Sequence, residues 1–358
     1  MKFHPPASEN RFLTMTTVLL TGASGYIGKH IALQLLNDGY TVRASVRKLS
    51  KGDEVHSAVA PHITHGVDLA SQLSFVELDL EKDAGWSQAL IGIDVLMHTA
   101  SPFPLGSPKD ENELIRPAVE GTLRALRAAK AAGITRVILT SSMAAIFARD
   151  LPAGANAYDE SMWTDVNHPA GKDGYIRSKT LAEQAAWDFI KNQAPEIGLT
   201  VINPALVLGA PLDDNFGASI SLVERLLKGK DPMVPDLNMP IVDVKDVARM
   251  HVQSIKVAAT AGERILSVSE TKSFMEIAKL LKVNYPQSKV KTVLAPNLLI
   301  KFLSLFDSAI KSVVANLGKP SLISHAKAER LLGISFIPAQ VSILESADYL
   351  YKNGLIKG

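Results

Sequence analysis

The chain has 358 residues, of which 47% are hydrophobic and 21% charged, and it contains no cysteine. This length exceeds one compact core and predicts about two domains, or one large α/β domain with an appended lobe. The lack of cysteine excludes disulfide bonds and thiolate metal sites and fits a cytoplasmic location, and a net charge of +2 without a basic run argues against nucleic acid as a partner. The nine histidines have no metal-ligand spacing, so we expect no metal site.

The N-terminus is polar, contains prolines and lacks the apolar core of a signal peptide. Because Met15 directly precedes the first apolar run, residues 1–14 are interpreted as a flexible extension. The most apolar later segment, 294–314, is interrupted by Lys301, Asp307 and Lys311. These charges exclude a membrane-spanning helix. They favour an amphipathic helix packed on the protein, with docking on a membrane surface as the alternative.

Strand-like runs alternate with helical patterns as far as residue 203. The predicted strands are 17–21, 41–46, 75–78, 94–99, 136–141 and 200–203, and the predicted helices are 27–37, 85–90, 113–132 and 175–192. Alternation of this kind, with continuously apolar strands, indicates a parallel sheet covered by helices on both faces. The expected fold class is therefore a doubly wound α/β fold.

Prolines and glycines become frequent after Pro204, so loops and short helices are expected there rather than a regular repeat. Residues 264–268 are a candidate for one more strand. The rest of the chain predicts helices over 273–283, 296–317, 324–332 and 341–353.

Three glycines, Gly22, Gly25 and Gly28, join the first predicted strand to the first predicted helix. They would permit a tight turn, the close approach of a ligand, and packing of the helix on the strand. A helix N-terminus offers unpaired N–H groups and a partial positive charge, which favour a diphosphate. The sequence predicts a dinucleotide-binding loop in which Ser24 bonds phosphate oxygens, and a turn made for packing alone is the alternative.

The second predicted strand lacks a carboxylate at its end and is followed by Arg47 and Lys48. An acidic residue there would bind the free ribose hydroxyls of NAD. A guanidinium instead suits a 2′-phosphate. The prediction is NADP(H), with Lys51 as a weaker candidate for the same phosphate and a solvated basic loop as the alternative.

Tyr175 and Lys179 are four residues apart at the start of a predicted helix, which places them on one face. They follow a predicted strand that ends near Ser142. A nearby ammonium favours phenolate, so we expect Lys179 to lower the pKa of Tyr175 and to make it a general acid or base. An ordinary helix surface is the alternative. His98, at the end of the fourth predicted strand, is interpreted as a packed, hydrogen-bonded histidine.

Together these motifs resemble those of the extended short-chain dehydrogenase/reductases, in the branch of dihydroflavonol 4-reductase-like and cinnamoyl-CoA-reductase-like carbonyl reductases. The matching pieces cover the chain from about residue 17 to 252 and are TGASGYIG (21–28), TVRASVR (41–47), ELDL (77–80), VLMHTASP (95–102), PAVEGT (117–122), LTSSMA (139–144), YIRSKTLAE (175–183), INPALVLG (202–209) and VDVKDVARMHV (242–252). The resemblance implies an NADP-binding Rossmann domain of residues 15–203 plus about 241–268, and a smaller substrate lobe of residues 204–240 plus 269–358.

The resemblance also implies roles for individual positions. Ser142 matches the catalytic serine, Tyr175 the acid, and Lys179 the lysine that also holds the nicotinamide ribose. The positions expected to contact the cofactor are Gly22, Ser24, Gly25, Tyr26, Ile27, Gly28, Arg47, Lys51, Asp79, Leu80, Thr99, Ala100, Ser101, Thr140, Tyr175, Lys179, Pro204, Val207 and Ser219.

One position departs from the plant dihydroflavonol reductases, in which an asparagine five residues after the catalytic serine binds the flavonoid hydroxyls. Here that residue is Phe147, and the residues before it offer no hydrogen bonds. A smaller or more apolar carbonyl compound is therefore expected as the substrate. The candidate pocket residues are Phe103, Met143, Phe147, Met162 and Phe216, with Met239 as a further one, and each is alternatively a core residue.

The sequence thus predicts NADPH-dependent reduction of an aldehyde or ketone by a monomer or homodimer, without nucleic acid or membrane partners. An epimerase or dehydratase for sugar nucleotides, retaining NAD, is the nearest alternative, and Arg47 argues against it. A 3β-hydroxysteroid dehydrogenase is the second. A non-catalytic NADP sensor is the third, and the presence of Ser142, Tyr175 and Lys179 argues against it.

Overall fold

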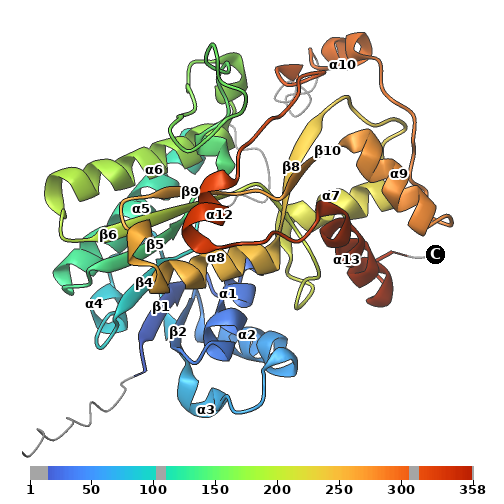
Figure 1. Cartoon of the computed structure of the whole chain (residues 1–358). Coiled ribbons are helices and arrows are strands. Elements are labelled where there is room, and N and C mark those ends of the chain that lie inside the picture. The colour runs from blue at the N-terminus through green and yellow to red at the C-terminus, as the bar shows by residue number, and fades with distance from the viewer. Residues whose placement is uncertain (1–14, 102–109, 306–313, 357–358) are drawn as a thin grey trace, which may run out of the picture.

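The computed structural model describes residues 15–101, 110–305 and 314–356. A seven-stranded parallel sheet has the strand order β3-β2-β1-β4-β5-β6-β9 (Figure 1). Its strands are β1 (Thr17–Thr21), β2 (Thr41–Val46), β3 (Leu73–Glu77), β4 (Val95–His98), β5 (Arg136–Thr140), β6 (Gly198–Pro204) and β9 (Arg264–Ser267). Chain order reverses direction between the neighbours β1 and β4, and ligands bind beyond the carboxyl ends of the strands at such a point.

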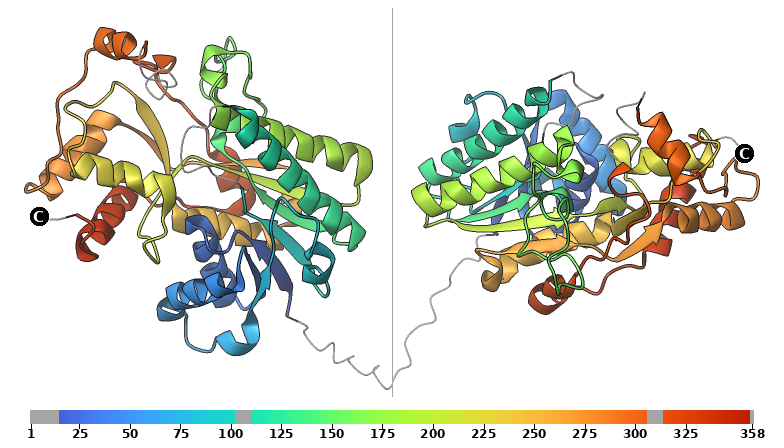
Figure 2. Two further views of the ribbon diagram at one scale, coloured as in Figure 1. Left: turned by 180° about the vertical axis from the view of Figure 1, so that it is seen from behind. Right: turned by 90° about the horizontal axis from the view of Figure 1, so that it is seen from above.

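Helices cover both faces of this sheet (Figures 1 and 2). One face carries α1 (Tyr26–Asn37) and α8 (Val244–Lys256), and the other carries α4 (Trp86–Ala89), α5 (Asn112–Ala131) and α6 (Gly174–Gln193). The short helices α2 (Gly52–Val59) and α3 (Leu69–Gln72) connect β2 to β3. Because the strands bury apolar side chains on both faces, each helix layer closes its own hydrophobic core.

The C-terminal lobe is built on a second sheet of three strands. Strand β8 (Asn238–Asp243) pairs in parallel with β7 (Leu206–Leu208) and antiparallel with β10 (Glu270–Ser273). Around them pack α7 (Gly217–Leu227), α9 (Phe274–Asn284) and α13 (Ala339–Lys352), which share one core. Helix α10 (Asn297–Leu303) comes after α9 in the chain. Helix α12 (Ala326–Leu332) instead packs against the large sheet, on β9 and on the covering helix α8.

The doubly wound fold class is confirmed, and β1 and β2 have the predicted bounds. The expectation of loops and short helices after Pro204 was wrong in part, because besides loops and α7 this region contains β7, β8 and α8, a helix of 13 residues. Pro240 signalled a break but lies inside β8, opposite Thr271. The predicted helix 296–317 is described only in part, as α10. Within the described ranges, no helix has the length and apolar character needed to cross a bilayer. The predicted domain boundaries stay a prediction.

Candidate active site

Two of the three glycines of the first turn are required by close backbone contacts. Gly22 has φ +72°, and a Cβ at this residue would lie 2.7 Å from the backbone nitrogen of Ala100. A Cβ on Gly28 would lie 2.1 Å from the carbonyl oxygen of Gly22, so only glycine lets α1 pack this closely on β1. Gly25 is the N-cap of α1 and has no such clash, because its Cβ would lie 3.4 Å from the nearest atom. Its exposed position leaves the helix N-terminus open to an anion.

The end of β2 carries the candidate 2′-phosphate site. Arg47 follows β2 directly and is exposed. The pKa of Asp79 is held below its ordinary value, mainly by a hydrogen bond from the Glu81 backbone and also by nearby cations that include Arg47. Arg47 and Asp79 are therefore neighbours at this edge of the sheet. Lys51 is already paired with Glu54.

The segment after β4 is bonded to the end of β1. The Thr99 hydroxyl donates to the Thr21 carbonyl at 2.5 Å, and the Ala100 backbone N–H donates to the Thr21 hydroxyl at 3.2 Å. His98 is buried, and its Nδ1 lies 2.8 Å from the same hydroxyl. Burial lowers the pKa of His98 to about 4, so the prediction of a packed, hydrogen-bonded histidine is confirmed.

Ser142, Tyr175 and Lys179 meet at the carboxyl end of β5. Tyr175 lies in the first turn of α6, where Asp173 accepts hydrogen bonds from the backbone, and its side chain is hydrogen-bonded to that of Ser142. The Lys179 ammonium donates to the Ser101 hydroxyl at 2.7 Å and lies 5.8 Å from the centroid of the Tyr175 ring. The structure thus places together the three residues that were predicted as catalytic.

The expected lowering of the Tyr175 pKa is not found. Burial raises this pKa and outweighs the hydrogen bond from Ser142, which lowers it, and Asp173 raises it further. Burial also lowers the pKa of Lys179 to about 8. The Lys179 ammonium is bonded to Ser101, so burial is the larger influence on the pKa of Tyr175. Tyr175 therefore holds its proton at neutral pH.

A cavity of about 740 Å³ opens beside Ser142 and Tyr175. Of the predicted pocket residues, Met143, Phe147 and Met239 line it, as does Ser219, which was predicted to bind the cofactor. Lining residues that the sequence analysis missed include Leu151, Tyr158, Ala205, Leu206, Leu222 and Leu322. Most of the wall is therefore apolar.

Two of the predicted pocket residues do not line this cavity, and one lies outside the described residues. Met162 does not line the cavity but packs in one hydrophobic cluster with Met143. Phe216 packs edge-on against Tyr349, with ring centroids 6.3 Å apart, at the edge of the lobe's core. Phe103 lies outside the described residues.

Four other residues predicted to contact the cofactor lie at strand ends or in packed clusters. The Thr140 hydroxyl lies 2.7 Å from Nε2 of His251 on α8. Val207 is buried in a cluster with Tyr26 and Ile27, at the start of α1. Two further cofactor candidates lie within the fold's framework: Pro204 ends β6, and Leu80 packs near Gly121 of α5.

The lobe also contacts the glycine loop. The Asn215 side-chain amide donates to the Ser24 carbonyl at 3.0 Å, and the Tyr26 hydroxyl donates to the Gly209 carbonyl at 3.0 Å. Both lobe residues lie between β7 and α7. This connection therefore borders the site expected to hold the diphosphate.

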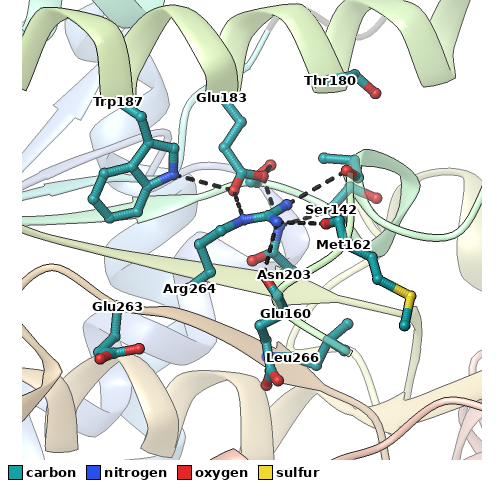
Figure 3. A network of polar contacts seen from close by, with 12 residues as sticks. Ser142, Glu160, Met162, Thr180, Glu183, Trp187, Asn203, Glu263, Arg264 and Leu266 are labelled. Atoms are coloured by element: carbon teal, nitrogen blue, oxygen red, sulfur yellow. Dashed lines mark hydrogen bonds and ion pairs between the residues drawn. The ribbon is translucent and has the colours of Figure 1, made fainter. Parts of the chain in front are cut away.

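Figure 3 shows a polar network behind Ser142 that the sequence analysis missed. Its centre is Glu183, which accepts hydrogen bonds from Ser141 and Asn203 and forms an ion pair with Arg264. One signal was present in the sequence, since Glu183 follows Lys179 by four residues and shares its helix face. Within the described part of the chain, no three His, Asp or Glu residues are grouped to hold a metal ion.

The fold and site define a Rossmann-type protein with a dinucleotide site at the switch point and a Ser-Tyr-Lys cluster beside a cavity. Residues 18–268 match the sequence profile of the NAD dependent epimerase/dehydratase family, and the chain belongs to that family. Together with the relatives named below, this match confirms the resemblance drawn from the motifs.

Several relatives and solved structures of similar chains are reductases. The chain is 31% identical over 336 residues to the cinnamoyl-CoA reductase CAD2 of Medicago truncatula, covering 93% of this chain and 95% of that one. It is 31% identical over 289 residues to an anthocyanidin reductase of Vitis vinifera, covering 77% and 83%. The yeast methylglyoxal/isovaleraldehyde reductase Gre2, solved in complex with NADPH, superposes with a TM-score of 0.76 at 25% identity, covering 95% and 100%.

Proposed function

We propose that the chain is an NADPH-dependent reductase that transfers hydride to the carbonyl carbon of an aldehyde or ketone and yields an alcohol. The observation that carries this proposal is the hydrogen-bonded pair Ser142–Tyr175, with Lys179 beside the ring, at the inner end of a largely apolar cavity. The reductases among the relatives support the same reaction class.

The residues present fit the cofactor. Glycines 22, 25 and 28 form a cradle that a Cβ would fill or obstruct, and the open N-terminus of α1 suits a diphosphate. Arg47 stands where a 2′-phosphate would be bound, and β2 ends without a carboxylate. NADPH supplies the hydride when bound. The relation to a reductase solved with NADPH supports this choice of cofactor.

The protein's own residues handle the proton and the carbonyl oxygen. The Ser142 hydroxyl orients the carbonyl oxygen, and Tyr175 donates its phenolic proton to that oxygen as negative charge develops on it. The raised pKa of Tyr175 keeps this proton available at neutral pH. Lys179, held by Ser101, places a positive charge near the phenolate that remains.

The cavity favours an apolar substrate. Its volume of about 740 Å³ exceeds the needs of a small aldehyde and lies within the usual range for ligand sites. Phe147 lines the wall at the position where the flavonoid-binding asparagine is expected, so it offers no hydrogen bond to a polyphenol. Aryl or alkyl ketones and aldehydes therefore fit better. The alternative of a sugar-nucleotide epimerase is not favoured by the relatives or by Arg47.

The test measures NADPH and NADH oxidation separately with aldehydes, diketones, aryl ketones and a dihydroflavonol. We expect preference for NADPH and turnover of apolar carbonyl compounds. Tyr175→Phe should lower kcat by about 10²–10⁴-fold while the Kd of NADPH is retained. Tyr158→Phe is the matched control, because Tyr158 also lines the cavity but its hydroxyl donates to the Arg149 carbonyl at 2.7 Å.

Two results would contradict the proposal. Near-full turnover by Tyr175→Phe would remove the assigned proton donor. No turnover with either cofactor, together with NAD retained through purification, would support the epimerase alternative.

A further inference from the structure

Helix α6 carries a third polar side chain in line with the two predicted catalytic ones. Tyr175, Lys179 and Glu183 are spaced by four residues and so share one face of the helix. Glu183 is only 1% exposed. It lines a small cavity of about 20 Å³ together with Lys179 and Ser141, so it borders the catalytic cluster in a cavity separate from the substrate cavity.

The Glu183 carboxylate is hydrogen-bonded to two residues that adjoin Ser142, namely Ser141 in the sequence and Asn203 on the neighbouring strand. Its Oε2 accepts hydrogen bonds from the Ser141 hydroxyl at 2.5 Å and from Nδ2 of Asn203 at 2.7 Å. The same Nδ2 donates to the Ser142 carbonyl at 3.1 Å. The backbone of Ser142 is thus held at two points, by the bond from the Ser141 side chain to Glu183 and by the bond from Asn203 to the Ser142 carbonyl.

The other carboxylate oxygen of Glu183 accepts from Nε of Arg264 at 2.5 Å. Arg264 extends from β9, and its Nη1 donates to the carbonyls of Glu160 and Met162 at 2.9 and 2.7 Å. Its guanidinium also lies 3.7 Å from the centroid of the Trp163 ring. Arg264 therefore fixes the segment around residue 163 to the core of the protein.

This segment in turn supports the turn that follows Ser142. The Thr164 hydroxyl donates to the Ala144 carbonyl at 2.6 Å, and the Thr164 backbone N–H donates to the Ala145 carbonyl at 3.0 Å. The backbone N–H of Ala144 donates to the Ser142 hydroxyl at 3.2 Å. A chain of bonds therefore runs from the buried ion pair to the hydroxyl that would orient the carbonyl oxygen.

A buried ion pair is a poor device for stability alone, because desolvation of two charges offsets much of their attraction. Catalytic side chains, by contrast, must be held within about 0.5 Å of their working positions by surrounding hydrogen bonds. We propose that Glu183 and Arg264 are positioning residues, whose ion pair acts through Ser141 and Asn203 to hold the Ser142 hydroxyl against Tyr175. This inference rests on the proposed reductase function.

The test is a double-mutant cycle that combines Glu183→Gln with Ser142→Ala. Glutamine keeps the size of the side chain but removes its charge and one acceptor. We expect Glu183→Gln alone to lower kcat by about tenfold to hundredfold, because small misplacement of catalytic groups is costly. The Kd of NADPH should stay within about twofold of the wild type, because the network does not touch the glycine loop. In the Ser142→Ala background the same change should alter kcat by less than about threefold.

Two further variants keep the test decisive. Ser141→Ala removes one hydrogen bond to Glu183 with little change in volume, and its cycle with Ser142→Ala replaces the first one if Glu183→Gln does not fold. Asp246→Asn is the matched control: Asp246 is fully buried, is paired with Arg249, and accepts a backbone hydrogen bond from Ile337 at 2.7 Å. It should lose thermal stability while the kcat of the folded protein is unchanged.

The outcomes separate this inference from the proposed function. Three results would overturn the positioning role and leave the reductase function intact. They are a wild-type kcat in Glu183→Gln, losses of kcat that multiply when Glu183→Gln is combined with Ser142→Ala, and a loss of kcat in Asp246→Asn equal to that in Glu183→Gln. A wild-type protein that binds NADPH but reduces no carbonyl compound would overturn the proposed function, and the positioning role with it.

Discussion

At the scale of single residues, burial rather than neighbouring charge sets the protonation of the candidate catalytic pair. The motif Tyr-x-x-x-Lys predicted which residues meet, and the structure places Tyr175 and Lys179 together. It could not predict their pKa values, because the pKa of Tyr175 is raised and that of Lys179 lowered by desolvation, which depends on the whole fold.

The pKa of Lys179 gives a prediction for the pH dependence of reduction. Lys179 loses its positive charge as the pH rises through about 8, while the raised pKa of Tyr175 keeps the phenol protonated there. We expect kcat/KM for NADPH, which reports ionisations of the free enzyme, to fall above this pH. In Lys179→Arg the guanidinium keeps its charge across this pH range, so the fall should disappear even if the rate at neutral pH is lower. A wild-type profile that stays level well above pH 8 would count against the role of the ammonium.

The sequence separates pocket residues from core residues less clearly than it singles out the candidate catalytic ones. Met143 and Phe147 line the cavity, but Met162 and Phe216 pack in cores instead. An apolar side chain carries no local sign of whether it faces a cavity or a core. Glu183 was missed for a related reason, because its partners Asn203 and Arg264 come from strands that only the folded sheet brings near α6.

At the scale of elements, glycine has two different roles in the turn between β1 and α1: Gly28 permits packing, and Gly25 leaves room for a ligand. A Cβ on Gly28 would collide with the Gly22 carbonyl, whereas a Cβ on Gly25 would make only ordinary contact. We expect Gly28→Ala to lower the melting temperature by several degrees, as a backbone clash of about 1–3 kcal/mol would. Gly25→Ala should keep the wild-type melting temperature yet weaken NADPH binding at least about tenfold, because its methyl group would face the diphosphate.

Thermal unfolding without cofactor and fluorescence titration with NADPH measure the two effects separately. Equal melting temperatures for the two variants, or unchanged NADPH affinity in Gly25→Ala, would contradict this assignment of the glycines.

Elements were predictable where local sequence and tertiary role agree. Strands β1 and β2 match their predicted bounds, since each is a continuous run that is buried in a parallel sheet. Strands β7 and β10 were missed because they have only three and four residues and take their regularity from pairing with β8. Such pairing across the chain leaves little periodicity in any one segment.

At the scale of the whole molecule, two uncharged histidines bond elements that lie far apart in the sequence. His98, at the end of β4, bonds Thr21 of β1, and His251 of α8 bonds Thr140 of β5. Burial lowers the pKa of each from 6.5 to about 4. Each hydrogen bond holds the carboxyl end of one strand close to the candidate active site, so we expect protonation of either residue to loosen the sheet edge that carries that site.

The depressed pKa values make folding depend on pH with a definite sign. The unfolded chain binds protons to these histidines below about pH 6.5, but the folded chain does so only below about pH 4, so their stabilisation is complete above pH 6.5 and is lost between these values. A shift of this size corresponds to about 3 kcal/mol for each histidine. We expect His251→Asn to be less stable than the wild type at pH 7 but to lose about 3 kcal/mol less on acidification to pH 4. Urea unfolding across this range measures the difference, and His56→Gln is the control because His56 is exposed. If His251→Asn lost as much stability as the wild type over the same range, the buried imidazole would not be a source of the acid sensitivity.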